Sequence, residues 1–355
     1  MTQTKIAFAL AGLGGFNAHG AGFLQAARDN NVIPDLVTAT SGQIVVLEAY
    51  LRGETDLKKG LVDPAIEGNP LAQIKIAMFG YDGVFKPALP EAISRLFMPP
   101  YFGLGLDFLA DRLLPAQIYK PSRTAQTIAG IKETFNSSPV GVVFNAYDPA
   151  SGVGRLYGND AARERMETTS SVPVLPDQKS ADPRVGKQGS EEDVIHEIDE
   201  HAIEAALWLS LYGFAGMPGG LIDGAYHRSC ILSELHNFED IFVCRPLANG
   251  WRDNELPQNY FDVQDWNTEM WFSVSYKAEV DAMKRINRLV NRGAFRPEAG
   301  MKEVRLWEVE PDTPAGYFNY FIERESVFDA ARTQGSEKFR EAAARTASAD
   351  TTQPG

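Results

Sequence analysis

The opening of the chain alternates short apolar runs with helical segments, and this order limits the fold more than any other feature. Residues 5–11 (KIAFALA) form a continuous apolar run ending at glycines, which is typical of a strand buried in a parallel sheet. The pattern then predicts a helix over 18–31, a second strand over 32–40 and a second helix from Gln43. A strand–helix–strand–helix opening predicts a doubly wound α/β fold with a mostly parallel sheet.

The rest of the chain continues the alternation of strands and helices. The predicted elements are a β-hairpin over 139–158, helices over 196–213, 269–293 and 325–346, and strands over 238–247 and 302–312. We find no internal repeat and no Pro/Ser-rich linker, which favours one domain over residues 1–340. Residues 60–135 and 171–200 are predicted to be capping or lid insertions, and 341–355 a disordered tail.

Composition excludes several classes of protein. Of 355 residues, 44% are hydrophobic and 23% charged, which is ordinary for a globular protein. The formal net charge of −13 argues against a nucleic-acid-binding protein, which normally has a basic face. Two cysteines indicate no disulfide framework. No apolar run approaches the roughly 18 residues of a membrane span, so we predict no transmembrane segment and a cytoplasmic location.

Ser41 lies where the second predicted strand meets a helix, within TATSGQIVV. A nucleophilic serine on a sharp strand-to-helix turn occupies this position in G-x-S-x-G sequences, where the turn exposes its hydroxyl. Here Ala39 and Gln43 replace the two flanking glycines. The alternative is that Ser41 caps the following helix, a common role for serine.

A glycine-rich loop follows the first strand. The amides of Gly12, Leu13, Gly14 and Gly15 could point at a developing oxyanion, which requires small residues and close backbone approach. A dinucleotide-binding loop is the alternative, but Asn17 breaks the G-x-G-x-x-G spacing.

Asp223-Gly224-Ala225 forms a second candidate turn. Asp223 could accept the proton of a serine directly, and the alternative is an ordinary Asp-Gly turn. A Ser-His-Asp triad is less favoured, because His227 and His236 follow the aspartate too closely. The histidines of HEIDEH (196–201) are five residues apart, so they would not share one helical face. We therefore expect no metal site.

Taken together, these motifs resemble those of the patatin-like phospholipase family. The family pattern A-L-S-G-G-G-A-R-G-A-Y-x-x-G-V-L falls without gaps on residues 9–24, ALAGLGGFNAHGAGFL. Its P-D-x-x-x-G-T-S-A-G pattern falls on residues 34–43, PDLVTATSGQ, and its D-G-G/A motif on residues 223–225. The resemblance covers residues 5–340 and implies a three-layer α/β fold with a central, mostly parallel sheet flanked by helices.

The resemblance also implies roles for individual residues. Ser41 would be the nucleophile and Asp223 the base of a Ser-Asp dyad. The implied oxyanion loop comprises Gly12, Leu13, Gly14 and Gly15, and the implied neighbours of the dyad are Gly42, Gly224 and Ala225. Phe16 replaces the arginine of the family loop, Asn17 replaces the glycine after it, and Gln43 replaces the glycine of the serine motif.

The implied activity is hydrolysis of the acyl esters of lipids through an acyl-enzyme, with no cofactor. The implied partners are a lipid or other acyl ester, with peripheral contact to a membrane or lipid particle and no nucleic acid. Two alternatives remain open, namely a polyester hydrolase of the polyhydroxyalkanoate type with the same dyad, and a catalytically inert protein that binds lipid or a partner. The aromatic stretch 81–108 is interpreted first as core and second as an acyl-chain groove. Segment 176–193 is either a lid or a disordered loop.

Overall fold

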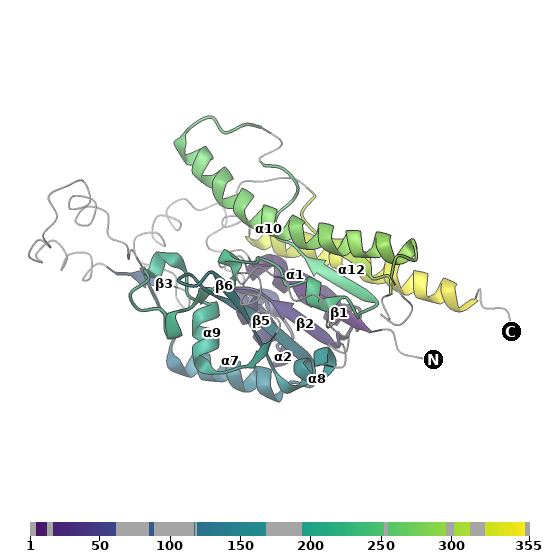
Figure 1. Ribbon diagram of the computed structural model, residues 1–355, viewed down its shortest axis with the longest axis horizontal. Coiled ribbons are helices and arrows are strands. Elements are labelled where there is room, and N and C mark those ends of the chain that lie inside the picture. The colour runs from purple at the N-terminus through teal and green to yellow at the C-terminus, as the bar shows by residue number, and fades with distance from the viewer. Residues whose placement is uncertain are drawn as a thin grey trace, which may run out of the picture.

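The computed structural model describes residues 5–12, 17–61, 85–88, 117, 119–167, 194–251, 255–295, 302–312 and 324–351 (Figure 1). The strands are β1 (Ile6–Leu10), β2 (Leu36–Ala39), β3 (Phe85–Pro87), β4 (Tyr119–Pro121), β5 (Gly141–Asp148), β6 (Val153–Gly158), β7 (Ile195–Glu197), β8 (Ile222–Asp223), β9 (Asp240–Cys244) and β10 (Arg305–Val309). The α-helices are α1 (Asn17–Asp29), α2 (Gln43–Leu51), α3 (Leu57–Leu61), α7 (Ala125–Ser137), α8 (Asp160–Glu167), α9 (Glu200–Ala206), α10 (Tyr260–Asn291) and α12 (Arg324–Thr351). Short 3₁₀ turns lie at Ser210–Tyr212 (η1), Pro218–Gly220 (η2), Gly224–Tyr226 (η3) and Ser233–Leu235 (η4).

The central sheet has the strand order β10-β9-β1-β2-β5-β6-β7, and β8 pairs with β5 outside this path. Strands β10, β9, β1, β2 and β5 are parallel to one another, whereas β6 and β8 run antiparallel to β5. The chain leaves β1 toward β2 and later returns to β9 on the other side of β1. In open α/β sheets such a switch creates a crevice at the carboxyl ends of the strands. The predicted mixed α/β fold with a mostly parallel sheet is confirmed.

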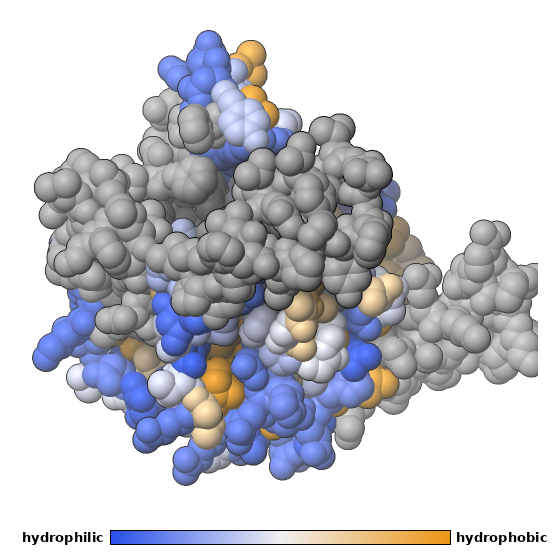
Figure 2. Space-filling view, turned by 90° about the vertical axis from the view of Figure 1, so that its left-hand side faces the viewer, coloured by the Kyte–Doolittle hydropathy of each residue, from blue (hydrophilic) through white to orange (hydrophobic). Residues whose placement is uncertain are grey.

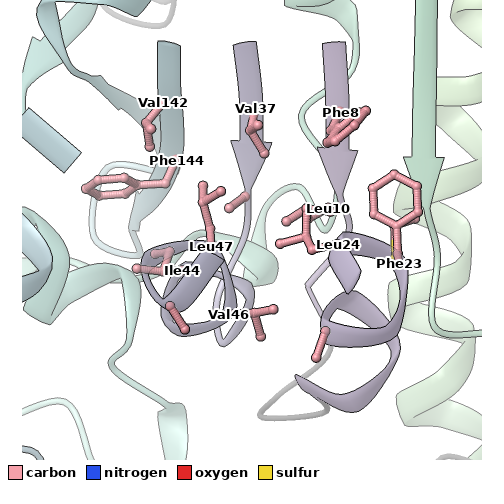
Figure 3. Close-up of a cluster of buried hydrophobic side chains, with 14 of the residues drawn as sticks. Phe8, Leu10, Phe23, Leu24, Val37, Ile44, Val46, Leu47, Val142 and Phe144 are labelled. Atoms are coloured by element: carbon pink, nitrogen blue, oxygen red, sulfur yellow. The ribbon is translucent and has the colours of Figure 1, made fainter. Parts of the chain in front are cut away.

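Alternate side chains of each strand enter two separate cores, because successive strand residues point to opposite faces of a sheet. Phe8 and Leu10 pack on the face covered by α1, α2, α7, α9 and α12 (Figure 3). Ala7 and Ala9 face the opposite core, to which α8 and α10 contribute side chains. The sheet therefore lies between two helical layers.

The structure revises two of the predicted helices. The segment 196–213 contains the end of β7 and then the short helix α9, which Asp199 caps by accepting a hydrogen bond from Ala202 N at 2.7 Å. The HEIDEH segment is thus split between a strand and a helix. Helix α10 begins at Tyr260, well before the predicted start at residue 269, because Asn259 provides a side-chain cap for Asp262 N.

The predicted disordered tail is wrong for residues 341–351, which continue helix α12 to Thr351. Alanines are the strongest helix formers, and the EAAARTASA stretch is rich in them. Phe339 and Ala342 are also buried in the core beside α1, so packing anchors this part of the helix.

Much of the two predicted insertions lies outside the described residues, including 62–84, 89–116 and 168–193. The aromatic stretch 81–108, apart from 85–88, and the lid segment 176–193 therefore remain sequence-based predictions. Among the helices that the structure describes, none combines the length and apolar character needed to cross a membrane.

Candidate active site

Ser41 lies on a strained turn between β2 and α2. Its φ of 59° falls in the left-handed region, which costs a non-glycine residue on the order of 1–3 kcal/mol and is found mostly at functional sites. Gly12 permits the turn, because a Cβ at that position would lie 2.7 Å from Thr40 O and 2.9 Å from Ser41 Cβ. The predicted strand-to-helix elbow is therefore present despite the altered flanking residues.

The Ser41 hydroxyl donates a hydrogen bond to Asp223 Oδ2. The second carboxylate oxygen of Asp223 accepts from Ala225 N at 2.8 Å. Helix α2 has Gly42 at its N-cap and no side-chain capping bond, so the interpretation of Ser41 as a helix cap is wrong. The structure brings together the two residues that sequence reasoning paired.

Asp223 reaches Ser41 because β8 pairs with the carboxyl-terminal half of β5, beyond the part that pairs with β2, with Asp223 opposite Ala146. The turn that follows lies directly on β5. A Cβ at Gly224 would lie 2.2 Å from Asn145 Cγ and 2.6 Å from its carbonyl carbon. Glycine is therefore required at this position by close backbone approach, with the Asp-Gly turn setting the carboxylate orientation.

Burial determines the electrostatics of the dyad. Asp223 is 1% exposed, and desolvation raises its pKa to about 7, although the Ser41 bond, the Ala225 N–H and the charge of Arg123 all lower it. A general base works best when its pKa lies near the operating pH, because it is then both available and basic. The Asp223 carboxylate meets this requirement without a histidine.

Arg123 and Tyr212 are site residues that sequence reasoning missed. Arg123 lies just before α7 and is hydrogen-bonded to Tyr212, and its positive charge acts on Asp223. Burial raises the pKa of Tyr212 to about 12, so this phenol is neutral at physiological pH. Nothing in the local sequence marks either residue, because only the fold brings these loops to the dyad. Arg123 supplies a cation to a site whose glycine loop has Phe16 in place of arginine.

The glycine loop is described only at its start. The Gly12 N–H donates to Ser229 O at 2.7 Å, so Gly12 supports the elbow and does not present this amide to a substrate. Leu13, Gly14 and Gly15 lie outside the described residues. On the other side of the dyad, no residue in the described part of the chain accepts a hydrogen bond from Gly42 N. An amide directly after the nucleophile is a usual oxyanion donor.

Gln43, the departure from the serine motif, is accommodated by Gly20 of α1. A Cβ at Gly20 would lie 1.8 Å from Gln43 Oε1 and 2.8 Å from its Cδ. The glutamine is buried, so its side chain occupies volume that a larger residue at position 20 would fill. The large side chain of Gln43 thus fits because Gly20 has no side chain.

We expect Gly20→Ala to destabilise the protein by about 1–3 kcal/mol, the usual cost of overpacking a filled interior. In a Gln43→Ala background the same substitution should be neutral or stabilising, since alanine is the better helix former. Urea unfolding of the four proteins measures this coupling. Additivity within about 0.5 kcal/mol would show that the two positions are independent.

The histidines occupy other environments. The His227 ring stacks on Tyr147, with centroids 5.3 Å apart, and His236 Nδ1 lies 3.0 Å from Ser233 O. His19 is buried in α1, where desolvation lowers its pKa to about 4 and keeps it neutral. Ser41 is paired with Asp223 directly, which favours a dyad over a triad.

Comparison with known proteins adds little to this geometry. No protein-family model matches the chain, and no curated protein sequence matches it either. Among solved structures, the crystal structure of VipD from Legionella pneumophila is similar, with a TM-score of 0.37 and 12% identity over 96% of this chain and 67% of that chain. The elbow and the serine–aspartate contact therefore carry the functional argument.

Proposed function

We propose that this protein is a patatin-like serine hydrolase that cleaves acyl esters of lipids with a dyad of Ser41 and Asp223. The observation that carries the proposal is the hydrogen bond from the Ser41 hydroxyl to Asp223 Oδ2 on a left-handed elbow. A strained, buried serine bonded to a base with a pKa near neutrality is the arrangement that nucleophilic catalysis requires.

In the proposed reaction, Ser41 Oγ attacks the ester carbonyl carbon while Asp223 Oδ2 takes the hydroxyl proton. The tetrahedral intermediate collapses, the ester C–O bond breaks, and Asp223 returns the proton to the departing alcohol. Water then attacks the acyl-enzyme, with Asp223 taking one proton from it and returning it to Ser41 as the acid is released. Each step moves one proton between Asp223 and Ser41, the departing alcohol or the attacking water.

We assign the oxyanion contacts to the Gly42 amide and to the amides of Leu13, Gly14 and Gly15. Gly42 directly follows the nucleophile at the start of α2, where the positive end of the helix dipole also favours developing negative charge. Arg123 keeps Asp223 partly ionised, since its charge lowers the aspartate pKa against the effect of burial. It thereby favours the proton-accepting form of the dyad.

The proposal predicts that a fluorophosphonate probe labels Ser41 covalently, because the activated hydroxyl attacks phosphorus as it would an ester carbonyl. Mass spectrometry of the labelled peptide should locate the adduct at Ser41, with no adduct in the Ser41→Ala protein. An unlabelled Ser41 in folded protein would instead support the inert lipid- or partner-binding alternative. Comparing phospholipid with polyhydroxyalkanoate then separates the two proposed substrate classes.

A further inference from the structure

One face of α10 carries an unusual sequence of exposed side chains. Positions three or four residues apart lie on one helical face, and one such row consists of Val263, Asn267, Met270, Val274, Lys277, Asp281, Arg285, Arg288 and, just after the helix, Arg292. Trp266 and Trp271 flank the row. We call this set, with the two tryptophans, the α10 face.

The first half of the α10 face carries exposed apolar side chains, with Asn267 as an exposed polar residue and Met270 partly buried. Val274 is 55% exposed and Trp271 51% exposed. The acidic residues of this half of the helix, Asp262, Asp265 and Glu269, are all buried. In Figure 1 the amino-terminal half of α10 rises clear of the body of the molecule, and in Figure 2 hydrophobic and hydrophilic side chains lie together at this raised end. Exposed aromatic and aliphatic side chains here thus lie among uncharged polar ones such as Gln264 and Asn267, while the three acids are buried.

The second half of the α10 face is basic. Lys277, Arg285, Arg288 and Arg292 are exposed, with Asp281 as the one acid in the same row. This concentration of positive charge contrasts with the formal net charge of −13 for the whole chain. Tryptophan side chains favour the membrane interface, and Lys and Arg near an anionic lipid surface are attracted to it, so the two halves of this face fit the same kind of surface.

The α10 face also adjoins the dyad. The Trp271 ring contacts Tyr226, with centroids 5.2 Å apart, and Tyr226 belongs to the turn that directly follows Asp223. The hydroxyl of Tyr226 donates to Ser210 Oγ at 2.8 Å. Ser210 begins the turn followed by Leu211 and Phe214, which are both exposed. Exposed apolar side chains thus come from two elements that meet beside the proposed catalytic base.

We propose that the α10 face docks the protein on an anionic lipid surface, with Trp266, Trp271 and Val274 entering the headgroup region and the basic half contacting lipid phosphates. The inference rests on the proposed function, because it presents the dyad to an aggregated lipid substrate. Tryptophan is enriched where an apolar environment meets water, since its ring is amphipathic.

Docking is tested by vesicle binding in the 355-residue Ser41→Ala protein, so that hydrolysis plays no part. The probes are vesicles of phosphatidylcholine mixed with phosphatidylglycerol, and of phosphatidylcholine alone, in co-sedimentation assays. We expect binding to the anionic vesicles, weaker binding to the neutral ones, and a loss of about tenfold or more in affinity with Val263→Glu plus Val274→Glu. Arg285→Glu plus Arg288→Glu should weaken binding by at least about fivefold for each charge removed.

Matched controls use exposed residues outside the α10 face. Ile33→Glu removes an apolar side chain that is 73% exposed, and Arg340→Glu reverses an exposed charge on α12; both should bind as the parent does. Circular dichroism checks the fold of each variant. The inference would be overturned if the Ser41→Ala parent did not bind the anionic vesicles, or if the variant with both valine substitutions bound them as tightly as the parent. Concentration-dependent dimerisation abolished by the valine substitutions, without vesicle binding, would instead assign the face to a second copy.

The outcome is independent of the labelling experiment. If vesicle binding depends on the α10 face but the probe does not label Ser41, the docking proposal stands and the hydrolase proposal is rejected. If the probe labels Ser41 but the protein does not bind vesicles, the hydrolase proposal stands and the docking proposal is rejected.

Discussion

Replacing Ser41 by alanine is expected to lower kcat/KM for hydrolysis of p-nitrophenyl butyrate by at least about 10³-fold, because the reaction loses its nucleophile. The Asp223→Asn protein should lose a similar amount, since an amide cannot accept the serine proton. Initial-rate measurements at pH 8 compare the variants with the parent. Residues that act as a unit are not additive, so the double variant should be no slower than either single one.

The matched control for this experiment is Ser137→Ala, which removes an exposed serine hydroxyl at the end of α7. Its rate should equal that of the parent. A Ser41→Ala protein that retains its rate within about tenfold would contradict the proposed role of Ser41, provided that its circular dichroism is unchanged.

Asp223→Asn is also expected to stabilise the folded protein at alkaline pH. The folded-state pKa of Asp223 is raised from 3.8 to about 7 by burial, so the folded protein binds a proton more tightly than the unfolded chain. The parent's stability should therefore fall as the pH rises from about 4 to about 7 and level off above that. A pKa difference of this size corresponds to about 4 kcal/mol. Asparagine has no such titration, so its advantage over aspartate should grow across the same pH range.

Urea unfolding followed by tryptophan fluorescence at several pH values from 4 to 9 measures this difference. The informative quantity is the difference in free energy of unfolding between the two proteins, because other titrating groups cancel in it. A difference that stays constant across the range would contradict the raised pKa. If the stability advantage of Asp223→Asn grows with pH and this variant has lost hydrolysis, then the carboxylate that acts as the base also destabilises the folded protein.

The backbone conformation of Ser41 and the burial of Asp223 each lower the stability of the folded protein. Ser41 has a left-handed backbone conformation, and Asp223 is a carboxylate placed almost completely out of water. Strain and buried charge of this kind persist only where the surrounding structure enforces them. Here Gly12 and Gly224 enforce them by allowing close backbone contacts that no larger residue would permit.

Several elements were predictable from local sequence. The apolar run 5–11 indicated β1, and Gln43 was the predicted first residue of α2, as found. Gly293, with φ of 64°, ends the long helix as expected. These predictions depend on period and on turn residues, which act within a few positions of the chain. The failures have different causes. The start of α10 depends on a side-chain cap, and the length of α12 on core packing by Phe339.

The sequence by itself determined the strand–helix–strand–helix order of the opening, the position of a serine after a buried strand, and the presence of an Asp-Gly turn. Only the tertiary structure decided that Ser41 and Asp223 meet, that Arg123 acts on the pair, and that Gly20 makes room for Gln43. The reason is physical. Backbone propensity and apolar periodicity are local properties, whereas the contact of two polar side chains far apart in the chain depends on how strands pair and how far burial removes water from them.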